Sequence, residues 1–319
     1  MTKIIDRIES CEIPHPEFTK HLAHLERRVE RAILGGAFRI EAVIGPTRVG
    51  KSMLLNALAQ KYPETKSDGA RQVPVLTVQI PPSISPVMLP SSVLQALNIP
   101  TLSRGATSGQ LDRLMHDQLR LAGTRVILFE EASHVVEPGA RIVARAACDW
   151  FKNTAESLGV TMILFGVPRL RKLFSSNEQL RARSSAEIVF RPYSISSTEE
   201  REAYASCVKT YLAMFEQSGW RVSVPFNDIV CNSYLLSAGV VGVLSRLMQE
   251  LAFQLSFEAA PRAIEWNDFL KAAACVEGVG HPSCPPFMRD SVSPMEMNQC
   301  HAYMLDANDM TPLSQGALL

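Results

Sequence analysis

Residues 45–52 read GPTRVGKS and fit the phosphate-loop pattern G-x-x-x-x-G-K-[ST]. The octapeptide follows an apolar segment, residues 40–44, and precedes a helical run that starts at Met53, which is the strand–loop–helix context that the pattern requires. Gly45 and Gly50 allow the backbone to curl until its N–H groups and the helix N-terminus face phosphate oxygens. The stretch therefore predicts an α/β fold with a nucleotide site at the end of a strand. A glycine-rich turn that matches by chance is the alternative.

The residue types in this loop predict ATP and Mg²⁺ as cofactors. Lys51 is expected to reach the β- and γ-phosphates, and Ser52 to offer its hydroxyl to the metal. The expected nucleotide-binding residues are Gly45, Pro46, Thr47, Arg48, Val49, Gly50, Lys51, Ser52 and Met53.

Two adjacent acids end an apolar run in VILFEEASHVV, residues 126–136. The end of a buried strand is where an α/β protein usually keeps its chemistry. Glu130 is the candidate for holding Mg²⁺, and Glu131 for orienting a water toward the γ-phosphate. Asp is more usual at the first position, so the longer Glu130 would reach the metal through a different water, or hydrolysis would be slow. Two solvated acids at a strand exit are the alternative.

Strand candidates alternate with helical patterns over the first part of the chain, which is typical of a mainly parallel sheet covered on both faces. They lie near 40–44, 73–80, 126–130, 160–166 and 186–190. From about Ser196 the pattern becomes helical. One helical face there carries Val240, Leu244, Leu247, Leu251 and Leu255.

We therefore expect four parts. They are a helical extension (1–36), an α/β ATPase core (37–195), a small helical lid (196–275) and a Pro-rich acidic tail (276–319). From Glu277 onward the tail has five acids and one base, and we expect it to be mobile or docked on a partner.

Composition limits the function classes. The chain has 319 residues with 32 basic and 32 acidic side chains, so any nucleic-acid contact must come from a local patch. Seven cysteines without CxxC or regular spacing favour a reducing, cytoplasmic compartment over a disulfide framework or a zinc site. The start MTKIIDRIES lacks the apolar segment of a secretory signal, and prolines interrupt the uncharged stretch 72–103, so no membrane span is expected.

Several short motifs together resemble a known family, the AAA+ ATPases of transposition of the TniB or TnsC type. They are IPHP (13–16), IGPTRVGKS (44–52), the acid pair with ASH (130–134), ILFGVPRL (163–170) and NEQLRARS (177–184). The resemblance covers roughly residues 12 to 255. It implies that 37–195 is an AAA+ core and that the chain acts in DNA transposition in the bacterial cytoplasm, associated with the nucleoid when assembled.

The resemblance also implies roles for further residues. Arg183 resembles the arginine finger that reaches the γ-phosphate held by a neighbouring subunit, with Arg181 as the alternative. Arg246 would be a second sensor of nucleotide, and His134 would relay nucleotide state from Glu131, although a structural histidine is about equally expected. Val167 replaces the polar residue that many AAA+ proteins use to sense the γ-phosphate.

The implied partners are double-stranded DNA, further copies of this chain in a ring or filament, transposase subunits and a target-selection protein of TniQ type. Between residues 141 and 191 nine bases outnumber four acids, which permits salt-sensitive contacts with DNA phosphates. Arg104 and Arg113 are further candidates. Three alternatives stay open: a replication-initiation or helicase-loading protein, a signalling NTPase switch that binds no DNA, and a nucleotide-binding module without turnover.

Overall fold

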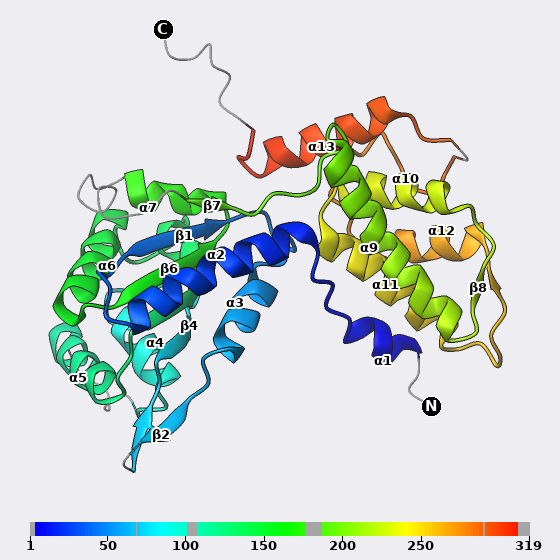
Figure 1. The fold of residues 1–319 in the computed structure, drawn as a ribbon. Coiled ribbons are helices and arrows are strands. Elements are labelled where there is room, and N and C mark those ends of the chain that lie inside the picture. Colours follow the sequence, from blue (N-terminus) through cyan, green and yellow to red (C-terminus); the bar gives the residue numbers. More distant parts are fainter. Residues whose placement is uncertain (1–3, 68, 101–106, 176–186, 290, 312–319) are drawn as a thin grey trace, which may run out of the picture. The chain divides into compact units, whose positions relative to one another are not determined.

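The computed structural model describes residues 4–67, 69–100, 107–175, 187–289 and 291–311 (Figure 1). The chain divides into two compact units. The α/β unit consists of Glu17–Gly45 and Lys51–Phe190. The helical unit consists of Met1–Pro16, Pro46–Gly50 and Arg191–Leu319.

A five-stranded parallel sheet forms the centre of the α/β unit, in the order β4-β5-β6-β1-β7. The strands are β4 (Val75–Gln79), β5 (Val126–Glu130), β6 (Thr161–Gly166), β1 (Ile40–Ile44) and β7 (Ile188–Val189). Every residue of β1 and β6 is buried, so both faces of the sheet are covered. The predicted parallel sheet is confirmed.

The register places the carboxyl ends of the strands at one edge. Ile44 pairs with Gly166 across β1 and β6, and Gln79 pairs with Glu130 across β4 and β5. The residues that follow these strands therefore lie along a single edge, which is where parallel α/β sheets bind ligands.

Helices surround this sheet (Figure 1). They are α2 (Pro16–Ile33), α3 (Lys51–Gln60), α4 (Met88–Ala96), α5 (Ser108–Leu121), η1 (Ala132–Val136), α6 (Ala144–Leu158), η2 (Pro168–Leu170) and α7 (Arg171–Ser175). The start of α5 is fixed by a capping box in which Thr107 and Gln110 exchange hydrogen bonds. An antiparallel hairpin, β2 (Thr65–Ser67) with β3 (Ala70–Gln72), was not expected from the sequence pattern.

The helical unit has its own apolar core. Its elements are α1 (Ile4–Glu9), α9 (Thr198–Gln217), β8 (Arg221–Val222), α10 (Phe226–Ser237), α11 (Val241–Leu255), β9 (Ala263–Ile264), α12 (Trp266–Ala274) and α13 (Pro294–Ala307). The predicted apolar stripe on α11 is buried in this core. The region is not purely helical, since β8 and β9 form a short parallel pair.

Both ends of the described chain contain helices. The extension expected over 1–36 contains two helices, of which α1 belongs to the helical unit and α2 largely to the α/β unit. The tail expected from 276 contains α13, whose Met297, Cys300 and Met304 are buried in the core of the helical unit. The four-part division of the chain stays a prediction.

Within the described part of the chain, no single helix is long and apolar enough to cross a membrane. Helices α10 and α11 pass that test only as a pair, and the pair is bent by 116°.

Candidate nucleotide site

The phosphate loop leaves β1 and enters α3 at Lys51. At its start, the Gly45 N–H donates to the carbonyl oxygen of Gly166 at 3.2 Å, which joins the loop to the end of β6. Within the loop, Arg48 and Gly50 have positive φ angles of 64° and 108°. Alternation of left- and right-handed residues turns successive N–H groups toward one side, an arrangement that binds anions.

Lys51 lies inside this loop. Its Nζ donates to the carbonyl oxygen of Gly45 at 3.0 Å. Burial lowers the pKa of Lys51 to about 8, although the carboxylates of Glu131 and Glu130 act in the opposite direction. The structure therefore brings together the lysine and both acids that the sequence singled out.

The two acids are held at the end of β5. Glu130 is the last residue of the strand, and its carbonyl oxygen accepts a hydrogen bond from the Ile80 N–H at 3.0 Å. Glu131 has a left-handed φ of 53° and precedes η1. A left-handed glutamate is uncommon, and such outliers gather at functional sites. Ser52 is an exposed residue in the first turn of α3. The site therefore contains carboxylate and hydroxyl groups, whose oxygens Mg²⁺ prefers.

Ser133 is a residue of the site that sequence reasoning did not single out, although it lies within the ASH motif. The residue is only 1% exposed, and its Oγ accepts a hydrogen bond from the Val167 N–H at 3.4 Å. A Cβ on Gly166 would lie 3.0 Å from the Ser133 backbone nitrogen and 3.2 Å from Oγ. The apolar Val167 is thus tied to the acid-bearing segment through its backbone.

His134 connects η1 to the end of β4. Its Nδ1 lies 2.8 Å from the Ile80 carbonyl oxygen, so this nitrogen carries the proton. Nε2 lies 3.7 Å from Glu137, which also pairs with Arg169 at 3.4 Å. Through these contacts His134 links η1 to the residue after β4. The expected relay from Glu131 stays a prediction.

The middle of the phosphate loop, Pro46–Gly50, groups with the helical unit. The Gly242 N–H, in the first turn of α11, donates to the Arg48 carbonyl oxygen at 3.0 Å. The Arg48 guanidinium bonds Glu277 twice, through the carbonyl oxygen at 3.3 Å and the carboxylate at 3.5 Å.

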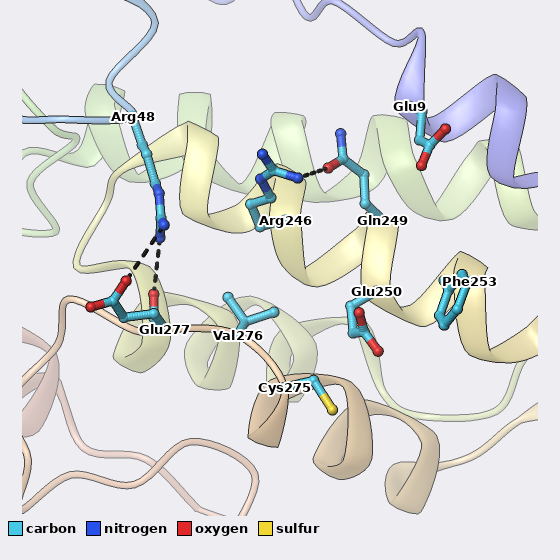
Figure 2. Close-up of a pocket in the computed structure, with 9 residues that line it drawn as sticks. All are labelled: Glu9, Arg48, Arg246, Gln249, Glu250, Phe253, Cys275, Val276 and Glu277. Carbon is cyan, nitrogen blue, oxygen red and sulfur yellow. Dashed lines mark hydrogen bonds and ion pairs between the residues drawn. The ribbon is translucent and has the colours of Figure 1, made fainter.

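Figure 2 shows the groove of about 460 Å³ in which this pair lies, with Arg246 on α11 beside it. Arg246 is exposed and donates to Gln249 at 3.3 Å. Its role as a second sensor stays a prediction.

The candidate arginine finger belongs to a segment that the structure does not describe. Arg183, its alternative Arg181, and Arg104 lie outside the described residues. Arg113 is described and is exposed on α5.

Solved structures share this architecture. The ORC2 protein of Aeropyrum pernix in its ADP form matches with a TM-score of 0.61 at 12% identity, over 86% of this chain and 72% of that chain. Cdc6p from Pyrobaculum aerophilum matches with a TM-score of 0.61 at 14% identity, over 85% and 71%. The A. pernix ORC1 protein in complex with DNA matches with a TM-score of 0.56 at 15% identity, over 86% and 69%.

Identities this low establish the fold alone. The fold is of the AAA+ type, and it carries the phosphate loop and the acid pair at one edge of the sheet. The family model described as bacterial TniB protein matches residues 6–192, and the chain belongs to this family. The resemblance found in the sequence motifs is thereby confirmed. No curated protein matches the chain.

Proposed function

We propose that this protein is an ATP-dependent regulator of DNA transposition that assembles on double-stranded DNA, links target selection to the transposase, and is reset by ATP hydrolysis. One observation carries the proposal: in a chain of the TniB family, Lys51 lies within electrostatic reach of Glu130 and Glu131 at the edge of a parallel sheet. A lysine in a phosphate loop and two acids are the groups that phosphoryl transfer needs.

We assign a role to each residue of the site. Lys51 would exchange its bond to the Gly45 carbonyl for the β- and γ-phosphates. Ser52 and Glu130 would hold Mg²⁺, which neutralises phosphate charge when bound. Glu131 would orient the attacking water, and Ser133 would keep the Val167 backbone in place beside it.

Assembly would depend on nucleotide through Arg183. A guanidinium supplied by a neighbouring copy stabilises the charge of the transition state and makes ATP part of the subunit contact. Such a head-to-tail contact either closes into a ring or continues as a filament. Hydrolysis removes the γ-phosphate and loosens the contact, which would reset the complex.

Support for DNA contact comes from exposed bases in the α/β unit. Arg169 and Arg171 already pair with Glu137 and Glu187. Arg141 and Arg145, by contrast, are exposed on either side of Val143, which is itself 74% exposed. We assign Arg141 and Arg145 to contacts with DNA phosphates, which do not depend on base sequence and weaken as salt is raised. Two proteins of similar fold were solved with DNA, the A. pernix ORC1 protein and Drosophila ORC.

The remaining partners rest on family membership. Transposase subunits and a TniQ-type target selector would bind exposed surfaces of the assembled protein in the bacterial cytoplasm, on the nucleoid. We assign the region from Glu277 onward, which is acidic in net charge, to contact with the transposase.

The experiment is a measurement of assembly size. Light scattering and negative-stain imaging would be done with and without duplex DNA, in ADP and in a non-hydrolysable ATP analogue. We expect large assemblies only with duplex and the ATP analogue, and none for Lys51→Ala. Equal assembly by Lys51→Ala would contradict the proposed mechanism. A matched Arg141→Gln, Arg145→Gln variant should lose assembly on DNA while it keeps nucleotide binding.

A second candidate, a replication-initiation or helicase-loading role, is favoured by the likeness to ORC and Cdc6 folds. A genetic experiment and a DNA-binding experiment distinguish the two functions. Loss of transposition with normal replication in a deletion strain supports the first, and preference for one origin sequence in a duplex competition supports the second.

A further inference from the structure

Arg48 and Glu277 form a long-range connection within the helical unit. The two residues are 229 positions apart, and the Arg48 guanidinium bonds both the carbonyl oxygen and the carboxylate of Glu277 (Figure 2). Arg48 belongs to the phosphate loop, whereas Glu277 follows α12. The contact therefore joins the loop to a segment that the phosphate-loop motif does not include.

The loop needs such a support because of its backbone. Arg48 has a φ of 64°, in the left-handed region that a residue with a Cβ adopts only at a cost in free energy. This conformation helps to turn the N–H groups of the loop toward one side. Two contacts keep Arg48 in this conformation. The Gly242 N–H donates to the Arg48 carbonyl oxygen, and the Arg48 guanidinium bonds Glu277.

Glu277 is followed by an anchored segment. The N–H groups of Val279 and Gly280 donate to the Leu236 carbonyl oxygen at 2.9 and 3.3 Å. A Cβ on Gly280 would lie only 1.7 Å from the Leu235 carbonyl oxygen, so the segment packs directly on the end of α10. A residue that precedes such a segment closely can hold a partner in place.

We propose that Glu277 is a positioning residue for the phosphate loop: it holds Arg48 in the left-handed conformation and so preorganises the loop for the phosphates of a nucleoside triphosphate. The inference rests on the proposed function, in that the loop binds ATP. It adds a regulatory consequence. A protein partner that binds the region after α12 would alter nucleotide affinity through Arg48.

The test is nucleotide affinity in Glu277→Ala, measured with a fluorescent ATP analogue and by steady-state ATPase assays. The bond to the Glu277 carbonyl oxygen survives this change, so we expect a partial effect. The Kd and KM for ATP should rise roughly 1.5- to 5-fold, the range for one exposed ion pair, with kcat unchanged. The difference should shrink in high salt, because exposed pairs are screened.

Three comparisons separate positioning from a simple change of charge. Glu277→Gln keeps an acceptor for Arg48 and should lie closer to the wild type than Glu277→Ala. Glu250→Ala removes another acid of the same groove, one that accepts from Gln254 at 3.0 Å, and should leave affinity unchanged. In an Arg48→Gly background, where glycine adopts the left-handed conformation freely, Glu277→Ala should have no effect.

The outcomes distinguish this inference from the function on which it rests. If wild-type protein and Lys51→Ala bind the analogue equally, the proposed nucleotide site is wrong. If Lys51→Ala loses binding while Glu277→Ala matches the wild type, only the positioning role is overturned. An equal loss from Glu277→Ala in the wild-type and Arg48→Gly backgrounds also overturns it, since the effect then does not pass through Arg48.

Discussion

The Nζ of Lys51 lies 3.0 Å from the carbonyl oxygen of Gly45, so the lysine spans its own phosphate loop. Burial there lowers its pKa to about 8. Phosphates placed beside the ammonium favour its charged form and raise the pKa again. Above pH 8, ATP binding must therefore take up a proton.

This linkage can be measured by titration calorimetry in two buffers of different ionisation enthalpy. At pH 8.5 we expect Lys51 to take up most of a proton per ATP, and only a small fraction of a proton at pH 7, because its pKa is lowered to about 8. Lys51→Arg should abolish the uptake at pH 8.5, because arginine stays charged. Equal uptake in this variant would assign the proton to another group.

The same pKa shift affects folding. Below pH 8 both the folded and the unfolded chain carry the Lys51 proton, so the folded state bears the full cost of a buried charge. Between pH 8 and 10.5 only the unfolded chain keeps the proton, so stability rises with pH. The lowering of the Lys51 pKa from 10.5 to about 8 corresponds to about 3 kcal/mol. In urea unfolding at pH 7, the free energy of unfolding of Lys51→Met should exceed that of the wild type by up to this amount. The difference between the two proteins should become smaller by pH 10.

The parts of the site that could be predicted from sequence are those in which neighbouring residues carry the signal. The phosphate loop and the acid pair lie directly after apolar strands, and the parallel arrangement brings these strand ends together. Gly242 and Glu277 could not be found in this way, because each meets Arg48 from about 200 positions away and no local pattern marks the contact. The hairpin β2–β3 was missed since its strands have three residues each.

Ser133→Ala tests the hydrogen bond that joins the segment after Glu131 to Val167, the residue that follows β6. The substitution leaves the Val167 N–H without its Oγ acceptor, which should cost about 1 kcal/mol of stability. Because Gly166 pairs with the end of β1, the loosened segment should lower kcat more than it raises KM for ATP. Ser157→Ala, an exposed serine on α6, is the matched control. Unchanged kcat in Ser133→Ala would restrict Ser133 to a structural role.

Arg28 and Glu41 form an ion pair within the α/β unit. Glu41 is the second residue of β1 and is 1% exposed, and its carboxylate is 3.3 Å from Arg28 Nε on α2. Arg28→Met leaves the buried charge without this partner and should cost about 3 to 5 kcal/mol of unfolding free energy. The double variant Arg28→Met, Glu41→Leu should recover most of the loss. Arg27→Met, which alters an exposed neighbour, should change stability by less than about 0.5 kcal/mol. A small effect of Arg28→Met would show that other contacts of Glu41 suffice.

Gly242→Ala tests whether the backbone geometry of the phosphate loop matters for ATP binding, because it changes no charged group. A Cβ at this position would lie 2.1 Å from the Arg48 carbonyl oxygen, an overlap that only movement of the loop backbone can relieve. We expect at least a tenfold loss of ATP affinity and about 1 to 3 kcal/mol of destabilisation. Gly109→Ala is the matched control, because a Cβ there meets nothing within 4 Å in α5 and should be neutral or slightly stabilising. If Gly242→Ala binds ATP normally while it remains folded, the contact between α11 and the loop has no part in nucleotide binding.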